Sequence, residues 1–293
     1  MAQSFSFLLR ILILNLLITA PALAGENPWD TKLPFKKATL NYSITGTENG
    51  SETLYIRNYG KEQATYRNTT SKIFFMTTKT ESIQIVTPDW IYSIDLQEKT
   101  GSKSVNPTKY MIEEYNSLSR SDRKKVLKNS EELGHSVTEG LQGEIEKNAA
   151  KILGYSCDKV SVMGSTIYMI SGTGLPLKSE TSMAGMNFKS VATGIDKGSA
   201  PDNVFIPPAG INLEHDPEAD QMARTMAKQT IEMLLDPDKM QAGAGQYSTT
   251  PPSSIGSGSE SGGAVMPAEG TEGQDMQDAM QKGMDALRGI FGN

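Results

Sequence analysis

The chain has 293 residues, of which 34 are acidic and 28 basic, so its formal net charge is −6. An acidic chain of this kind repels phosphate backbones, which disfavours nucleic acid as a partner. Cys157 is the only cysteine, which excludes an intramolecular disulfide scaffold, so the folded state must rest on a hydrophobic core.

The N-terminal segment has the pattern of a secretory signal. Arg10 precedes an apolar run over residues 11–18, Pro21 follows, and residues 22–24 (Ala-Leu-Ala) have the small-x-small pattern that a signal peptidase cleaves. The apolar run is too short for a membrane-spanning helix. We therefore expect residues 1–24 to be a cleaved signal and the mature protein to be soluble in the periplasm of a Gram-negative bacterium.

Residues 38–105 read as a succession of short β-strands. Runs such as ATLNYSITG and SETLYIRNYG alternate apolar and polar residues and are rich in Thr, Tyr and Ile. Turns are predicted at Asn49-Gly50 and at Gly60-Lys61. The pattern predicts an antiparallel meander with one apolar face and one solvated face.

A change of composition over residues 107–133 predicts one or two helices. This stretch carries many charges and few β-branched residues, with Ser121 as a candidate N-cap and Gly134 as a candidate stop. Short alternating strands resume at Gly154, and DNVFIPPAGINL closes the sheet region.

The segment LEHDPEAD (213–220) has two interpretations. Asp216 is a good N-cap and Pro217 suits the first helical position, which predicts a helix from here to about Leu235. The grouped carboxylates and His215 also allow a site for a hard metal ion. We favour the acidic helix start, because the helix dipole stabilises it.

Enzyme signatures are sparse. The chain has no G-x-S-x-G, H-E-x-x-H or C-x-x-C motif. We therefore predict a non-enzymatic protein with no catalytic residues, no metal site and no cofactor.

The C-terminal part divides into a linker and a short helix. Residues 237–273 are dominated by Gly, Ser, Pro and Thr and predict a flexible linker. Residues 274–293 regain helical periodicity, with an apolar face made of Met276, Met280, Met284, Leu287 and Phe291. Such a helix can bind a partner protein in a groove, or it can remain a frayed tail, since Gly283 lowers helix stability.

Cys157 lies in the alternating segment YSCDKVSVM. An exposed thiol there would suggest a redox sensor or an intermolecular disulfide, and a buried thiol would be a small hydrophobic residue. No His, Lys or Arg is adjacent in sequence, and Asp158 disfavours the thiolate. We predict that Cys157 packs within the sheet.

The order of the motifs resembles a known family. YSITGTENGSETLYIRNYGKEQATYRNTT, GYSCDKVSV, IYMISGTGLPLKSE and GMNFKSVATGIDKGSAPDNVFIPPAGINL follow one another over residues 38–213. They resemble the DUF4412-type envelope proteins of the lipoprotein-carrier-like (LolA/LolB/LppX-like) superfamily. The long helical insertion and the C-terminal tail depart from the carriers, and no position matches their lipid-handling arginine.

This resemblance implies a mainly β (α+β) fold for residues 25–236, namely a curved antiparallel half-barrel with helices on its open side. It also implies an apolar concavity that holds acyl chains of lipids or lipoproteins. In DWIYSIDL, Trp90, Tyr92 and Ile94 project to one face of a strand. The candidate ligand-binding residues are Tyr55, Phe75, Trp90, Tyr92 and Ile94. They can fill a closed core or line an apolar cavity.

Two functional hypotheses follow. The leading hypothesis is a periplasmic, non-enzymatic binding protein that holds a lipid or another hydrophobic ligand. The alternative is an envelope structural or interaction protein that recruits a partner through the helix at residues 274–293.

Overall fold

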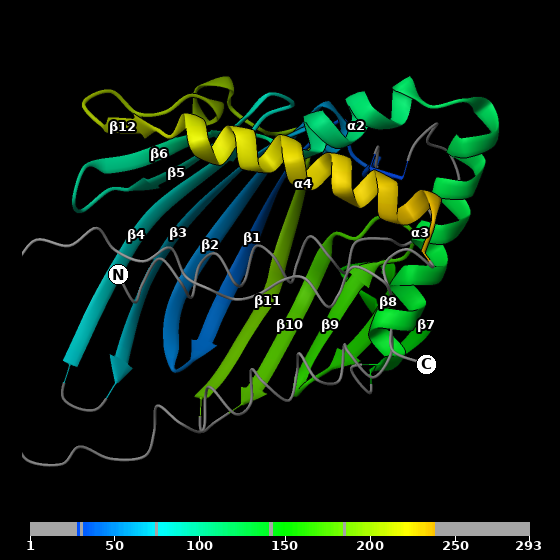
Figure 1. Cartoon of the computed structure of the whole chain (residues 1–293). Coiled ribbons are helices and arrows are strands. Elements are labelled where there is room, and N and C mark those ends of the chain that lie inside the picture. The colour runs from blue at the N-terminus through cyan, green and yellow to red at the C-terminus, as the bar shows by residue number, and fades with distance from the viewer. Residues whose placement is uncertain (1–27, 30–31, 74–75, 141–142, 184–185, 238–293) are drawn as a thin grey trace, which may run out of the picture. The chain divides into compact units, whose positions relative to one another are not determined.

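The structure is a computed structural model, and it describes residues 28–29, 32–73, 76–140, 143–183 and 186–237. The described residues form a curved, open sheet of twelve strands together with three helices (Figure 1). The predicted fold class is therefore confirmed at this level: the molecule is mainly β, and its sheet is not closed. The predicted signal peptide, the C-terminal helix and all but the first residue of the linker lie outside the described residues.

The strands follow the order β12-β6-β5-β4-β3-β2-β1-β11-β10-β9-β8-β7 across the sheet. Neighbouring strands are antiparallel except for β12 and β6, which are parallel. The strands are β1 Lys37–Gly46, β2 Glu48–Arg57, β3 Glu62–Ile73, β4 Met76–Val86, β5 Trp90–Asp95, β6 Thr100–Val105, β7 Glu144–Ile152, β8 Tyr155–Val162, β9 Ser165–Ile170, β10 Pro176–Met183, β11 Met186–Lys197 and β12 Asn212–His215.

The three helices are α2 Pro107–Ser117, α3 Arg120–Gly140 and α4 Pro217–Leu235, and together we call them the helix layer. Both α2 and α3 pack against α4, and Tyr115, Val126, Ile231 and Leu234 form a buried cluster between them. Figure 1 shows α4 crossing in front of the upper strand ends, with α3 beside β7 and β8.

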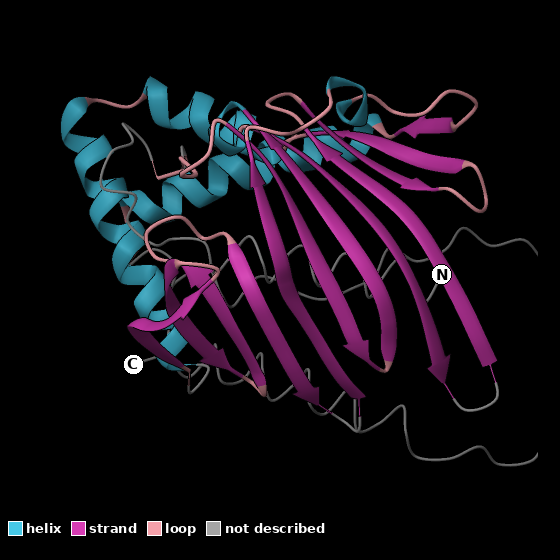
Figure 2. Cartoon of the chain, turned by 180° about the vertical axis from the view of Figure 1, so that it is seen from behind, coloured by secondary structure: helices cyan, strands magenta, loops and turns pink. Residues whose placement is uncertain are grey.

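The segment 198–211, which we call the strap, covers the other face of the sheet. It contains the short helix η2 (Asp202–Phe205) and connects β11 to β12. Thr39 Oγ1 donates to the carbonyl of Ser199, and Tyr66 OH donates to the carbonyl of Val204. In Figure 2, seen from behind, loops lie in front of the upper strand ends and the helices lie behind the sheet. The sheet therefore has a helix-side face and a strap-side face.

The buried face of the sheet changes sides between β1 and β3. On β1 and β2, Leu40 and Ile56 are fully buried on the helix side. On β3 and β4, the fully buried residues are Ala64 and Ile85, which point to the strap and pack in one cluster with its Phe205. Side chains alternate along every strand, so neighbouring strands can bury opposite faces without a change of register.

The helix boundaries differ in part from the expectation. The start of α4 at Pro217, after Asp216, is confirmed. The predicted start of α3 is wrong: Ser119 rather than Ser121 is the cap, and its Oγ accepts the N–H of Asp122 at 3.2 Å. The predicted stop at Gly134 is also wrong, because α3 continues to Gly140. A glycine inside a helix costs only about 1 kcal/mol, which a helix of this length tolerates.

The structure also differs from the expectation at one turn, and it contains one strand that was not predicted. The first hairpin turns at Thr47, and Gly50 instead pairs with Ile44 inside the ladder, where a Cβ would lie 2.1 Å from the carbonyl oxygen of Asn68. The turn near Gly60 is confirmed by the short helix η1 (Asn58–Gly60) between β2 and β3. Strand β7 was not predicted, because it is a charged edge strand whose ladder shifts between Glu146 and Ala150.

Candidate functional site

A strip of buried apolar side chains crosses the helix-side face in the middle of the sheet. It comes from β1, β2, β10 and β11, and we call it the apolar strip. Its members are Ala38, Leu40, Leu54, Ile56, Leu177 and Ala192. Leu33 and Phe35, from the segment before β1, pack in the same cluster. The irregular segment before β1 therefore belongs to the core cluster of the strip. No residue of a described helix belongs to that cluster.

The helix layer contacts the sheet near the two edges of the sheet. At one end, Val105 of β6 packs with Tyr110 of α2 and Ala227 of α4. Val105 is the register partner of Trp90 and has the strap-side parity of its strand, so the helices reach this face at the strand end. At the other end, α3 packs against β7. Among the described residues, the cluster inside the helix layer and the cluster of the apolar strip have no member in common. The helix layer is thus attached at its ends and has its own core.

Asp220 anchors the first turn of α4 to the sheet. The backbone N–H of Val105 donates to Asp220 Oδ1 at 2.9 Å, and His215 Nε2 lies 2.5 Å from Asp220 Oδ2. The hydrogen bond from Val105, with a further contribution from His215, holds the pKa of Asp220 below its ordinary value. This carboxylate therefore joins α4, β12 and β6 at one point.

Short, uncharged polar residues cover the helix-side face beyond the apolar strip, on β3 to β6. We call this region the hydroxyl surface. Its members are Thr65, Thr69, Ser71, Thr78, Thr80, Ser82, Gln84, Ser93, Ser102 and Ser104. The charged residues at helix-side positions of these four strands are Arg67 and Asp95. A sheet face that carries so few charges is unusual for a surface exposed only to solvent.

An ion cluster marks the border between the two regions. Arg67 Nη2 lies 2.6 Å from Glu48 Oε2, and Arg67 Nη1 lies 3.2 Å from Glu52 Oε2. Burial raises the pKa of Glu52, and Arg67 opposes that rise. In the same row, Tyr42 OH donates to the carbonyl of Pro176 at 2.9 Å, and burial raises the pKa of Tyr42. The guanidinium is thus engaged by two carboxylates.

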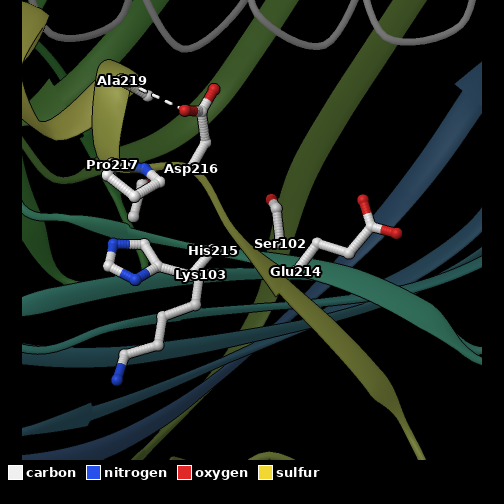
Figure 3. Close-up of a pocket in the computed structure, with 8 residues that line it drawn as sticks. Ser102, Lys103, Glu214, His215, Asp216, Pro217 and Ala219 are labelled. Carbon is white, nitrogen blue, oxygen red and sulfur yellow. Dashed lines mark hydrogen bonds between the residues drawn. The ribbon is translucent and has the colours of Figure 1, made fainter.

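A pocket of about 510 Å3 lies where β6, β12 and the start of α4 meet (Figure 3). Ser102 and Glu214 are register partners, and their side chains point to the same side in Figure 3. Lys103 and His215, the next pair in register, point to the other side. The pocket therefore combines polar and charged side chains with Pro217 and Ala219, and through Ser102 and Ser104 it adjoins the hydroxyl surface at the sheet edge.

The LEHDPEAD segment forms the helix start that its sequence predicts. Asp216 Oδ1 accepts the N–H groups of Glu218 and Ala219, at 2.9 and 3.3 Å. Asp220 is engaged by Val105 and His215, as described above. Within the ranges that the structure describes, no three His, Cys, Asp or Glu residues come together as ligands for a metal ion.

The predicted ligand-binding residues lie in two places. Tyr55, Tyr92 and Ile94 pack in the strap-side cluster. There the rings of Tyr55 and Tyr66 pack edge to face, with their centroids 5.5 Å apart. Trp90 packs instead with the helix layer, and Lys103 Nζ lies 3.7 Å from the centroid of its indole. Phe75 and the five apolar residues of the C-terminal helix lie outside the described residues. Their binding roles stay predictions.

Cys157 is fully buried in the same cluster as the apolar strip. Burial raises the pKa of its thiol, and the neighbouring Asp158 carboxylate adds to the rise. The prediction that Cys157 is a packing residue is confirmed.

The apolar strip and the hydroxyl surface were not identified from the sequence. The sequence does carry a signal, because Ser and Thr recur at alternate positions of β3 and β4. Alternation alone, however, predicts only that this face is solvated. Whether these residues face the strap or the helix layer depends on the tertiary structure, because both covering elements come from distant parts of the chain.

Comparisons with known proteins give a weak likeness in structure. No protein-family model and no curated protein matches the chain. An uncharacterized conserved protein from Thermus thermophilus aligns over 62% of this chain and 92% of its own, with 6% identity and a TM-score of 0.38. PNGF-II aligns over 67% of this chain with 11% identity and a TM-score of 0.31, and MucB over 68% with 11% identity and a TM-score of 0.30. The aligned part spans 33% of PNGF-II and 62% of MucB.

None of the helices in the described part of the chain has both the length and the apolar composition needed to cross a membrane.

Proposed function

We propose that this protein is an exported, non-enzymatic binding protein of the periplasm that holds a lipid or another hydrophobic ligand against the apolar strip, beneath the helix layer. The observation that carries the proposal is the separation of the two clusters among the described residues. Because the helix layer has its own core and contacts the sheet near its edges, it can move relative to the sheet without loss of either core. The resemblance of residues 38–213 to the lipoprotein-carrier-like superfamily supports the same function.

The binding energy would come from burial of apolar area. Each buried methylene contributes about 0.8 kcal/mol, so a chain of ten methylenes gains about 8 kcal/mol before the cost of ordering it. Leu40, Ile56 and Leu177 are fully buried in this structure. Ligand entry therefore requires that the residues packed on the strip, among them Leu33 and Phe35 of the segment before β1, move aside.

Native mass spectrometry and titration with a fluorescent fatty acid test the proposal. We expect lipid to co-purify with the protein and the fatty acid to bind. Ala192→Leu fills the apolar strip and should weaken fatty-acid binding, whereas Ala64→Leu adds the same volume on the strap side and should leave it unchanged. Both changes add volume to a core at a cost of about 1–3 kcal/mol, so thermal unfolding of both variants serves as the stability control. Absence of both co-purified lipid and fatty-acid binding would refute the proposal.

The alternative is recruitment of an envelope partner through residues 274–293. This idea rests on the sequence pattern of Met276, Met280, Met284, Leu287 and Phe291. Deletion of residues 238–293 separates the two functions. Loss of a partner with retained ligand binding would assign recruitment to the tail and ligand binding to the sheet and its helices.

A further inference from the structure

One row of register partners runs across the helix-side face from apolar to polar residues. From β1 to β12, the consecutive partners are Leu40, Leu54, Thr65, Gln84, Ser93, Ser102 and Glu214. Neighbouring strands lie about 4.8 Å apart, so the polar part of the row, from β3 to β12, spans about 19 Å. The apolar strip and the hydroxyl surface thus meet between Leu54 and Thr65, and the row ends at the pocket in Figure 3.

The polar residues of this row have unused hydrogen-bonding capacity. Thr65, Gln84 and Ser93 are half-buried, and their side chains make no hydrogen bond within the described residues. A half-buried hydroxyl or amide that lacks a protein partner is stabilised by a bound polar molecule or by water. Ser, Thr and Gln side chains both donate and accept hydrogen bonds, as sugar hydroxyl groups do.

The charges around this surface disfavour a charged head group. Arg67 is already held by Glu48 and Glu52, so its guanidinium is not available to a phosphate or a carboxylate. Glu214 and Asp216 line the pocket together with Lys103, so carboxylates offset the one lysine charge there. A quaternary ammonium group binds best over an aromatic face. The indole of Trp90 is already covered by Lys103 Nζ, which disfavours such a group there.

We propose that the ligand is an amphiphile with an uncharged polyhydroxyl head group, such as a glycosyl group. The chain lies on the apolar strip, and the head group forms hydrogen bonds with Thr65, Gln84 and Ser93 and extends toward the pocket beside Ser102. This assignment rests on the proposed function, because the chain must occupy the apolar strip.

Three probes with the same ten-carbon chain test the head group: decyl maltoside, decylphosphocholine and decanoate. Each is titrated into the full chain by calorimetry, below the concentration at which it forms micelles. We expect decyl maltoside to bind at least about tenfold more tightly than the other two, which corresponds to a few added hydrogen bonds. The triple variant Thr65→Val, Gln84→Leu, Ser93→Ala should lose this preference and still bind decanoate.

A matched triple variant removes hydroxyl groups from the strap-side positions of β1 and β3: Ser43→Ala, Thr45→Val, Thr70→Val. It should keep the preference for decyl maltoside. If the first triple variant does not fold, as judged by thermal unfolding, Gln84→Leu alone is tested.

The outcomes distinguish the two proposals. Equal binding of the three probes, or an unchanged preference in the first variant, overturns the head-group assignment and leaves the apolar binding function standing. Failure of all three probes to bind overturns both.

Discussion

At the scale of single residues, Asp158 shows how one buried carboxylate shapes an edge of the sheet. It accepts the backbone N–H of Asn148 at 2.9 Å, Ser171 Oγ at 2.6 Å and Lys147 Nζ at 2.9 Å. Asn148 has a positive φ of 53°, at the point where β7 departs from its ladder with β8. The carboxylate therefore stabilises the irregular backbone that interrupts the edge strand.

Asp158→Asn should destabilise the protein in a pH-dependent way. Burial alone would raise the pKa of Asp158, but the hydrogen bonds from Asn148, Ser171 and Lys147 outweigh it and lower the pKa below 3.8. A lowered pKa in the folded state stabilises the protein above the ordinary value, and that stabilisation is lost as pH falls through the lowered value. We expect a loss of about 1.5–3 kcal/mol at pH 7 in urea denaturation, shrinking below pH 3.8.

Asp196→Asn, at an exposed position on β11, is the control for this substitution and should change the free energy of unfolding little. An equal loss for Asp158→Asn at every pH would show that the charge of Asp158 does not contribute.

Arg67→Leu tests the ion cluster. The substitution leaves Glu48 and Glu52 without the guanidinium between them, at a cost of about 3–5 kcal/mol. Burial already raises the pKa of Glu52, and loss of Arg67 raises it further. A carboxyl with a raised folded pKa binds more protons in the folded state, so the stability of the variant recovers as pH falls.

Urea denaturation at pH 7 and pH 5 measures this recovery, and the deficit of Arg67→Leu should be smaller at pH 5. Arg67→Lys keeps the charge and should rescue part of the loss. A deficit that is as large at pH 5 as at pH 7 would contradict the role of Glu52.

At the scale of elements, close approach of backbones explains one glycine of β1. Gly46 has a φ of 117°, and a Cβ there would lie 2.2 Å from the carbonyl oxygen of Asn187 in the neighbouring strand. Gly46→Ala should therefore destabilise the protein by about 2 kcal/mol or more in urea denaturation.

Gly194→Ala is the matched control on β11, because no atom lies within 4 Å of the position that its Cβ would take. It should change stability by less than about 1 kcal/mol, in the stabilising direction, since alanine restricts the unfolded chain. Equal effects of the two substitutions would mean that the contact between Gly46 and Asn187 does not constrain the hairpin.

The elements differ in how well local sequence predicts them. The start of α4 follows from Asp216 and Pro217, because a cap and a first-turn proline act within a few residues. Strand β7 could not be predicted in this way, since charged residues and the interruption near Asn148 obscure its alternation. Its pairing with β8 makes it a strand.

At the scale of the whole molecule, the sheet has two cores on opposite faces. Leu40 belongs to the helix-side cluster and Ile85 to the strap-side cluster, and both are fully buried. Each substitution to alanine should cost about 2–5 kcal/mol. The two side chains belong to different clusters. The losses in the free energy of unfolding, measured by urea denaturation, should therefore add within about 0.5 kcal/mol in the double variant.

The coupled comparison is Leu40→Ala with Leu54→Ala, since these residues are direct register partners in one cluster. This pair should depart from additivity. Strong coupling between Leu40 and Ile85 would argue that the two faces form a single packing unit.

The sequence alone determined that the chain is mainly β, that Cys157 packs in the sheet and that a helix begins after Asp216. Period-two alternation and capping chemistry act over a few residues, so they are readable without the fold. The sequence also placed Trp90, Tyr92 and Ile94 on one face of a strand; Tyr92 and Ile94 pack beneath the strap, whereas Trp90 packs with the helix layer.

Only the tertiary structure decided which face of each strand is buried and which residues share a row. Alternation gives every strand two faces, and the covering elements, the strap and the helix layer, come from distant parts of the chain. The row from Leu40 to Glu214 depends on the register of six successive strand pairings, and a slip of one residue in any of them would move its side chains to the other face. Register is set by contacts far apart in sequence, which is why local pattern could not reveal it.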